Sequence, residues 1–325
     1  MNSDHAGVIP SEVEEWIERY ITFRLTRCHP RLLEWQGLEK TGANLENSLR
    51  GERRWLGDES VLKGYSKGCP VEGASPEEYG IRLLQFDGIG TLLAGIHFYG
   101  CDLDRPFIHV SAMDFELDSC GEGELRRLLW NEFGVFRPRW FRIWIDSDDS
   151  PLADLAGAWF DGYFLAGQLG AIQASARPSQ SERISLVAEP GLDSFAEYEE
   201  CYREFHKLHP GTEAWLEVSD RDAIETCAKA GANFRVRVDD EPGGWMAGKL
   251  DDSGPLSGWQ VVEESLETRF RGQGLAAAMQ RAFLDTLPGE DLVWGTIDTR
   301  NAASLRTARR VGREIVCGYL FLPFA

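Results

Sequence analysis

Two halves of the chain repeat the same succession of sequence patterns, and this internal repeat constrains the fold more than any other feature. The segment ELRRLLWNEF at 124–133 matches GLAAAMQRAF at 274–283, and WFRIWID at 140–146 matches LVWGTID at 292–298. Copies about 150 residues apart predict two related structural units in tandem. A chain of 325 residues is also long enough for two domains of ordinary size.

Each half alternates strand and helix patterns, which predicts an α/β protein. In the first half, strand patterns at 80–86, 91–99 and 107–117 follow one another in hairpin order, before a helix and a further strand. Additional helices are predicted within 10–36, with a break at Pro30.

A polar stretch without periodicity, ASARPSQSE at 174–182, is the predicted linker between the halves. The predicted domains are therefore 1–173 and 183–325. The match also pairs SPLADLAGAWFDG at 150–162 with the helical pattern AASLRTARRVG at 302–312.

The stretch RFRGQGLAAAMQRAF at 269–283 predicts a glycine turn that opens a helix. The start of a helix exposes backbone N–H groups and the positive end of the helix dipole, and both attract anions such as phosphate. Glycines at Gly272 and Gly274 would let a phosphate approach the backbone, while Arg269 and Arg271 add charge. A plain helix start with solvated arginines is the alternative interpretation.

The corresponding stretch of the first half, LDSCGEGELR, carries Asp118, Glu122 and Glu124 where arginines would be needed. Carboxylates repel a phosphate and cancel the attraction of a helix start. The first half is therefore predicted not to bind a phosphate at this position.

The composition narrows the class of protein. A formal net charge of -19 argues against nucleic acid as a partner and would favour a cationic substrate, although acidity also serves solubility. The seven cysteines include no Cys-x-x-Cys pair, so they predict free thiols in a reducing compartment. The polar N-terminal stretch and the lack of a long apolar run predict a cytoplasmic protein without a membrane segment.

The segment VVEESLETRFRGQGLA at 261–276 resembles the GNAT superfamily of acyl-CoA-dependent N-acetyltransferases. The family motif is Gln or Arg, two residues, Gly, one residue, then Gly or Ala, which Arg271 to Ala276 fits. The likeness continues in order through the helix to Leu287, the strand at 291–297 and the Asn-containing segment near 301. It spans roughly 182–325, with 79–173 as a degenerate copy. This resemblance implies two GNAT-like domains, each a mixed, mostly antiparallel twisted sheet flanked by helices.

The resemblance also implies that the second half binds acetyl-CoA as a co-substrate. Loop N–H groups would hold the pyrophosphate, and the pantetheine arm would pair with backbone near Leu266, where strand 261–266 diverges from the next strand. Asn301 matches the family's cofactor-contacting Asn, although it could equally cap the following helix. The implied cofactor-binding residues are Leu266, Arg269, Arg271, Gly272, Gln273, Gly274, Leu275, Ala276, Asn301 and Ser304.

Two adjacent carboxylates are candidates for the catalytic base. Transfer of an acetyl group requires that an amine lose a proton and attack the thioester. Glu263 and Glu264 lie on the strand that the family uses for such a group, and strand side chains alternate, so only one is expected to face the site. Spacing favours Glu263. The structural alternative is a solvated or paired carboxylate.

The family's usual acid, a Tyr on the last helix, is replaced by Ala308. Tyr319 is the candidate substitute, and Cys317 is a further one, although either could be core. The spacing from Asn301 through Ser304 to Gly312 is closer to the subgroup that resembles ribosomal-protein N-terminal acetyltransferases, where such a Tyr is not always present.

No metal site is predicted, because His206 and His209 lack a third ligand. The predicted function is acetylation of a primary amine on a small cationic molecule. The alternatives are acetylation of a protein or peptide N-terminus, transfer of a longer acyl chain, and a non-catalytic CoA-binding regulatory module. The sequence leaves the oligomeric state open.

Overall fold

The computed structural model describes residues 11–86, 88–118, 121–147, 149–289 and 291–324. Both halves contain consecutive antiparallel strands together with helices, as the sequence patterns predict. The helices are α1 (Ser11–Leu25), α2 (Pro30–Glu52), α3 (Glu59–Gly68), α4 (Glu122–Phe133), α5 (Leu169–Ala174), α6 (Phe195–Leu208), α7 (Arg221–Lys229), α8 (Ala276–Leu284) and α9 (Ala302–Arg310). The strands of the first half are β1 (Arg82–Phe86), β2 (Gly90–Phe98), β3 (Pro106–Met113), β4 (Trp140–Ile145) and β5 (Trp159–Gln168). The strands of the second half are β6 (Ile184–Ala188), β7 (Asn233–Val238), β8 (Glu241–Ser253), β9 (Leu256–Leu266), β10 (Leu292–Asp298) and β11 (Glu314–Pro323).

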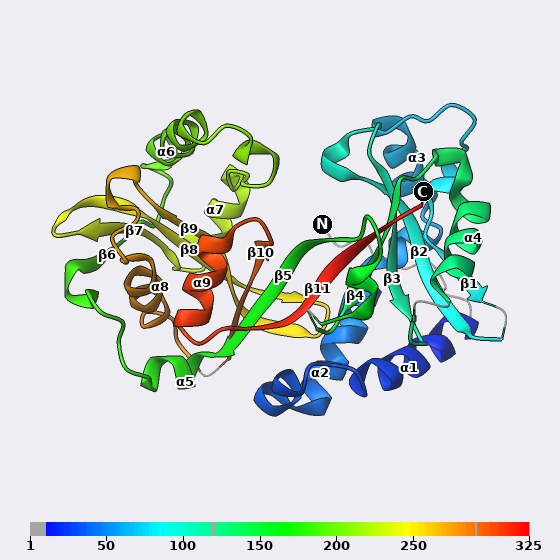
Figure 1. The fold of residues 1–325 in the computed structure, drawn as a ribbon, viewed down its shortest axis with the longest axis horizontal. Coiled ribbons are helices and arrows are strands. Elements are labelled where there is room, and N and C mark those ends of the chain that lie inside the picture. Colours follow the sequence, from blue (N-terminus) through cyan, green and yellow to red (C-terminus); the bar gives the residue numbers. More distant parts are fainter. Residues whose placement is uncertain (1–10, 87, 119–120, 148, 290, 325) are drawn as a thin grey trace.

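The described strands form one sheet of eleven strands in the order β1-β2-β3-β4-β11-β5-β10-β9-β8-β7-β6. Only the β3–β4 and β9–β10 neighbours are parallel; the other neighbouring pairs are antiparallel. Helices flank the sheet in both halves (Figure 1). The predicted fold class, a mixed and mostly antiparallel α/β architecture, is confirmed.

The two halves exchange their last strands. Strand β5 pairs with β10 of the second half, and β11 pairs with β4 of the first half, so each half is completed by a strand from the other. The two exchanged strands also pair with each other, which makes the sheet continuous across the molecule (Figure 1). The domain boundary at 174–182 stays a prediction, because strands that precede and follow this segment pair with strands of the opposite half.

Each half contains a parallel pair that separates after a short contact. Strands β9 and β10 pair only from Gly258 to Gln260, and β3 and β4 pair only from Phe107 to His109. An irregularity follows in each case, at Val262 in β9 and Ser111 in β3, where one strand carries an extra residue. The repeat seen in the sequence is therefore also a repeat of geometry.

Helices α1 and α2 cover the first half beside its separated strands. Trp16 and Leu49 pack with Leu93 and Ala112 in one buried cluster. The Asn44 side chain also donates to the Pro255 carbonyl oxygen at 3.2 Å, which ties α2 to the β8–β9 turn of the second half. Periodicity failed to show that α2 continues past Gly37, whose φ of 80° kinks the helix. Residues 151–154 form only a short 3-10 turn, although their sequence aligned with α9.

A buried ion pair joins α1 to β4, and its loss should destabilise the fold. The Arg24 guanidinium donates to both Asp146 carboxylate oxygens, at 2.7 and 2.6 Å. Changing Arg24 to Leu leaves the buried Asp146 carboxylate without its cation, so the free energy of unfolding should fall by about 3 kcal/mol in urea titrations. The same change at Arg31, whose pair with Glu34 is largely exposed, should leave the free energy of unfolding almost unchanged.

The pH dependence of that loss has a definite sign. Burial raises the pKa of Asp146 above its usual value, and removing Arg24 raises this pKa further. The destabilisation is therefore fully present above the raised folded-state pKa of the variant, and it shrinks as pH falls through that pKa toward the wild-type folded-state pKa. An equal loss at neutral and acidic pH would contradict the assignment.

Candidate functional site

A cavity of about 190 Å³ opens where β9 and β10 separate. Both strands line it, together with the segment between α6 and α7 and the start of α9. Residues that bear on its chemistry are Tyr202, Glu217, Ser219, Glu263, Glu264, Asp298, Asn301, Ser304 and Arg313. The divergence of the strands expected from the resemblance is therefore present, and it creates the cavity.

Glu263 lies on β9 directly after the irregular residue Val262, and its side chain is only 4% exposed. The Tyr198 hydroxyl donates to one carboxylate oxygen at 2.6 Å, and the Tyr202 hydroxyl donates to the other at 2.7 Å. The Ser219 hydroxyl donates to the first oxygen at 3.2 Å. These hydrogen bonds hold the carboxylate in one orientation. Burial raises the pKa of Glu263, while the hydroxyl donors oppose that rise.

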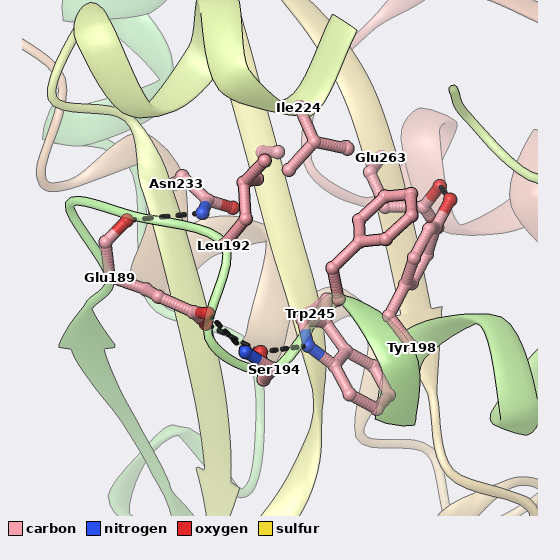
Figure 2. A pocket seen from close by; sticks show the side chains of 10 residues that line it. Glu189, Leu192, Ser194, Tyr198, Ile224, Asn233, Trp245 and Glu263 are labelled. Atoms are coloured by element: carbon pink, nitrogen blue, oxygen red, sulfur yellow. Dashed lines mark hydrogen bonds between the residues drawn. The ribbon is translucent and has the colours of Figure 1, made fainter. Parts of the chain in front are cut away.

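A second, smaller pocket that Glu263 also lines lies at the start of α6, the helix that carries these tyrosines. Glu189 accepts from the Ser194 backbone N–H at 2.7 Å and from its hydroxyl at 2.6 Å. The Trp245 indole donates to the Ser194 hydroxyl oxygen at 2.9 Å. Figure 2 shows this network beside the Tyr198–Glu263 bond. Its polar groups bond mainly to one another, so we interpret it as support for the start of α6.

Glu264 points to the other side of β9, toward α8, where its carboxylate accepts from the Gln280 amide. Alternation predicts that only one of the two carboxylates faces the site, yet both border the cavity, because β9 has no neighbour on that edge beyond Gln260. Burial raises the pKa of Glu264 to about 7, while the charge of Arg313 opposes that rise. Burial likewise lowers the pKa of Arg313 to about 10.

The glycine loop has the form predicted for an anion site. Gly272 and Gly274 adopt φ values of 75° and 78°, which residues other than glycine rarely adopt. Helix α8 starts at Ala276, and Leu275 before it has no side-chain acceptor to cap the helix. The N–H groups of the first turn are therefore left for a ligand.

The two loop arginines lie differently from the expectation. Arg269 is paired with Glu241 at 2.6 Å and Glu267 at 3.1 Å, which reduces its charge at the loop. The Arg271 guanidinium stacks over Phe205 at 4.0 Å and donates from Nε to the Leu266 carbonyl at 2.7 Å. Arg271 thus occupies the backbone acceptor expected to meet the pantetheine arm.

Two residues that the sequence did not single out border the same loop. The Gln180 amide donates to the Gln273 carbonyl at 2.8 Å, and Arg183 reaches the Gln273 side chain at 3.4 Å. Gln180 lies near the end of the predicted linker, a segment without periodicity, and Arg183 directly follows that linker. Only their position beside Gln273 in space identifies them.

Asn301 caps α9 by accepting from the Ser304 backbone N–H at 3.1 Å, and both residues line the cavity. The capping alternative is therefore present, and the position at the cavity is compatible with the cofactor role as well. The role in cofactor binding stays a prediction.

Tyr319 lies away from Glu263. It lines a separate small cavity in the first half, together with Tyr20, Glu52, His109 and Ser111. The cause is the strand exchange, which carries β11 to the side of β4. Burial raises the pKa of Tyr319 to about 12, so it is a poor proton donor. Cys317 is buried and its pKa is also raised by burial.

The first half lacks the corresponding chemistry in its described residues. The parallel pairing ends at His109 in β3 and at Gln260 in β9. Ala112, three residues beyond His109, therefore occupies the position that Glu263 occupies three residues beyond Gln260. At its helix start, the Asp118 carboxylate accepts from the Gly121 N–H at 2.7 Å, so the chain's own anion fills that position.

No protein-family model and no curated protein matches this chain. Among solved structures, it is similar to a GCN5-related N-acetyltransferase from Sphaerobacter thermophilus, with 16% identity and a TM-score of 0.46 over 82% of this chain and 86% of that one. An acetyltransferase from the GNAT family of Colwellia psychrerythraea matches with 11% identity and a TM-score of 0.45, over 83% and 97%.

A tandem GNAT protein from the clavulanic acid biosynthesis pathway is also similar, with 14% identity and a TM-score of 0.42, over 83% of this chain and 97% of that one. These neighbours are GNAT proteins.

Proposed function

We propose that this chain is a tandem GNAT-like enzyme whose second half transfers an acetyl group from acetyl-CoA to a primary amine of a small cationic molecule. The observation that supports this most is a buried, hydrogen-bonded carboxylate, Glu263, at a cavity between diverging strands. A glycine loop and an uncapped helix start lie at the end of the same strand. A base and an anion-binding loop are the two parts that such a transfer needs from the protein.

Glu263 would accept the proton of the attacking amine. The carboxylate is held by Tyr198 and Tyr202, and Glu263 also lines the cavity. Asp298 lines the cavity but is paired with Arg300 at 2.6 Å. Glu217 lines it as an exposed carboxylate, which would attract a cationic substrate. The reaction needs no covalent enzyme intermediate, because the amine attacks the thioester directly.

The loop residues fit a coenzyme A pyrophosphate. A side chain added at Gly272 would meet no atom within 4 Å, so the space beside this backbone is open to a ligand. The N–H groups of 272–276 would bind the phosphates, and Arg271 could add charge after leaving Phe205. Acetyl-CoA would supply the activated acetyl group.

The compartment is part of the proposal. The described cysteines are free thiols, mostly buried, which favours a reducing compartment such as the cytoplasm. Of the described helices, none combines the length and the apolar character needed to cross a bilayer.

Acetyl-CoA turnover against a panel of amines tests this proposal. Transfer to small polyamine-like or aminoglycoside-like amines supports it. Transfer only to peptide N-termini, or only from longer acyl-CoA donors, would favour the alternative enzymes. Acetyl-CoA binding without transfer to any amine would favour a regulatory module.

The pH profile of transfer should respond to Tyr202. Its hydroxyl bonds the ionised carboxylate, which lowers the pKa of Glu263 against the effect of burial. Changing Tyr202 to Phe should move the acidic limb of the rate profile to higher pH, since the base then ionises later. Changing Phe205 to Leu on the same helix should leave the limb in place. An unshifted limb in the Tyr202 variant would count against Glu263 as the base.

A further inference from the structure

Arg313 is a buried cation at the cavity. It lies between α9 and β11, and only 2% of its surface is exposed. Its guanidinium crosses β10 where that strand runs free of β9: a Cβ on Gly295 would lie 3.1 Å from Nη1. Glycine at 295 therefore leaves room for this side chain at the cavity wall.

The guanidinium has no bonded partner among the described residues. Its Nε is buried without a hydrogen-bond acceptor, and no carboxylate lies within 4.0 Å of it. Other buried arginines differ: Arg24 is bound by Asp146, and Arg281 by Asp285 and Ser175. Desolvating a guanidinium without a partner is costly, so a purely structural arginine is expected to be satisfied.

The nearest opposite charge does not neutralise Arg313. The charge of Glu264 on β9 opposes the effect of burial on the pKa of Arg313, but the Glu264 carboxylate is bonded to Gln280 instead. Burial raises the pKa of Glu264 to about 7, so near neutral pH this carboxylate is only partly ionised. Burial lowers the pKa of Arg313 to about 10, which leaves it charged at neutral pH. Arg313 thus places at one point of the cavity wall a positive charge with which no described carboxylate forms an ion pair.

The proposed reaction produces one new anion. When the amine nitrogen attacks the thioester carbon, the carbon–sulfur bond breaks and sulfur keeps the electron pair. The amine proton goes to Glu263, so sulfur leaves as a thiolate. The helix position that would carry an acidic Tyr is Ala308, which is fully buried, and Tyr319 lies in another cavity.

We propose that Arg313 stabilises the thiolate of coenzyme A as it leaves, in place of a side-chain acid. The thiolate is held as an ion beside the guanidinium and takes its proton from water after release. This assignment rests on the proposed function of the second half. A cation that strengthens its interaction only as charge develops on sulfur would lower the barrier selectively.

The test measures the pKa of the free coenzyme A thiol bound to the full chain, by the ultraviolet absorbance of the thiolate against pH. In the wild-type complex it should fall at least about one unit below the ordinary value of about 8.5. With Arg313→Met this lowering should be lost, and with Arg313→Lys it should be partly kept. Arg310→Met, an exposed change on α9, is the matched control and should behave as the wild type.

The affinity for acetyl-CoA and the rate of transfer distinguish the possible outcomes. Acetyl-CoA, which has no thiol, should bind the wild type and the Arg313→Met variant with affinities within about threefold, and transfer by that variant should fall at least about tenfold. The wild type could bind acetyl-CoA and transfer the acetyl group while the bound coenzyme A thiol keeps the pKa that it has in solution. That result would overturn the role of Arg313 and leave the transferase proposal intact. Failure of the wild type to bind acetyl-CoA overturns both. Should Arg313→Met not fold, the wild-type and Lys titrations still decide.

Discussion

Replacing Glu263 with Gln should lower the rate of acetyl transfer at neutral pH by about a hundredfold or more, with little change in acetyl-CoA affinity. The amide cannot accept the amine proton, yet it keeps the volume of the side chain. Its carbonyl oxygen can still accept from one of the two hydroxyls of Tyr198 and Tyr202, and its NH2 group can donate to the other. Steady-state kinetics with a saturating amine would measure the loss. The fold should persist, which the thermal unfolding midpoint can check.

Glu217 provides the matched control for that change. It lines the same cavity but is exposed, and no hydrogen bond holds it among the described residues. Changing Glu217 to Gln should raise KM for a cationic amine modestly and leave kcat within about twofold, since one surface charge contributes little. Transfer rates that are unchanged in the Glu263 variant would end its assignment as the base.

Replacing Gly272 with Val should weaken acetyl-CoA binding by about a hundredfold. A valine at a φ of 75° is strained, and its side chain would occupy the open space beside the loop N–H groups. Titration of acetyl-CoA by calorimetry measures the affinity directly.

A variant at Gly211 provides the control that distinguishes backbone strain from exclusion of the ligand. It adopts a φ of 90°, and a Cβ there would also meet no atom within 4 Å. Changing Gly211 to Val should therefore cost a similar amount of stability, about 1–2 kcal/mol, without lowering the affinity for acetyl-CoA. Equal effects of the two changes on affinity would mean that the loop does not hold the cofactor.

Much of the second half could be predicted from local patterns. The start of α8, the glycine loop and Glu263 all follow from spacing within a single strand–loop–helix segment. Tyr198 and Tyr202 were accessible in principle, because aromatic residues four apart on a predicted helix face the same side. Sequence alone could not show that both hydroxyls reach one buried carboxylate.

The arrangement of the halves could not be predicted, because strand exchange depends on pairing between distant segments. Nothing local to β11 specifies that it joins β4, yet this pairing removes Tyr319 from the site. The position of Arg313 has the same origin, since it lies where the chain leaves α9 to enter β11. Side chains alternate along β9 as expected, yet Glu263 and Glu264 both border the cavity, because β9 is paired with β8 there but has no neighbour on its other edge beyond Gln260.

One half of this chain is expected to bind acetyl-CoA at the 271–276 loop, and the other half is not. A calorimetric titration of the full chain with acetyl-CoA tests it directly, with Arg271→Glu as the comparison. We expect one site per chain in the wild type, and loss of binding in the variant through repulsion of the phosphates. No binding, or two sites per chain, would contradict this account.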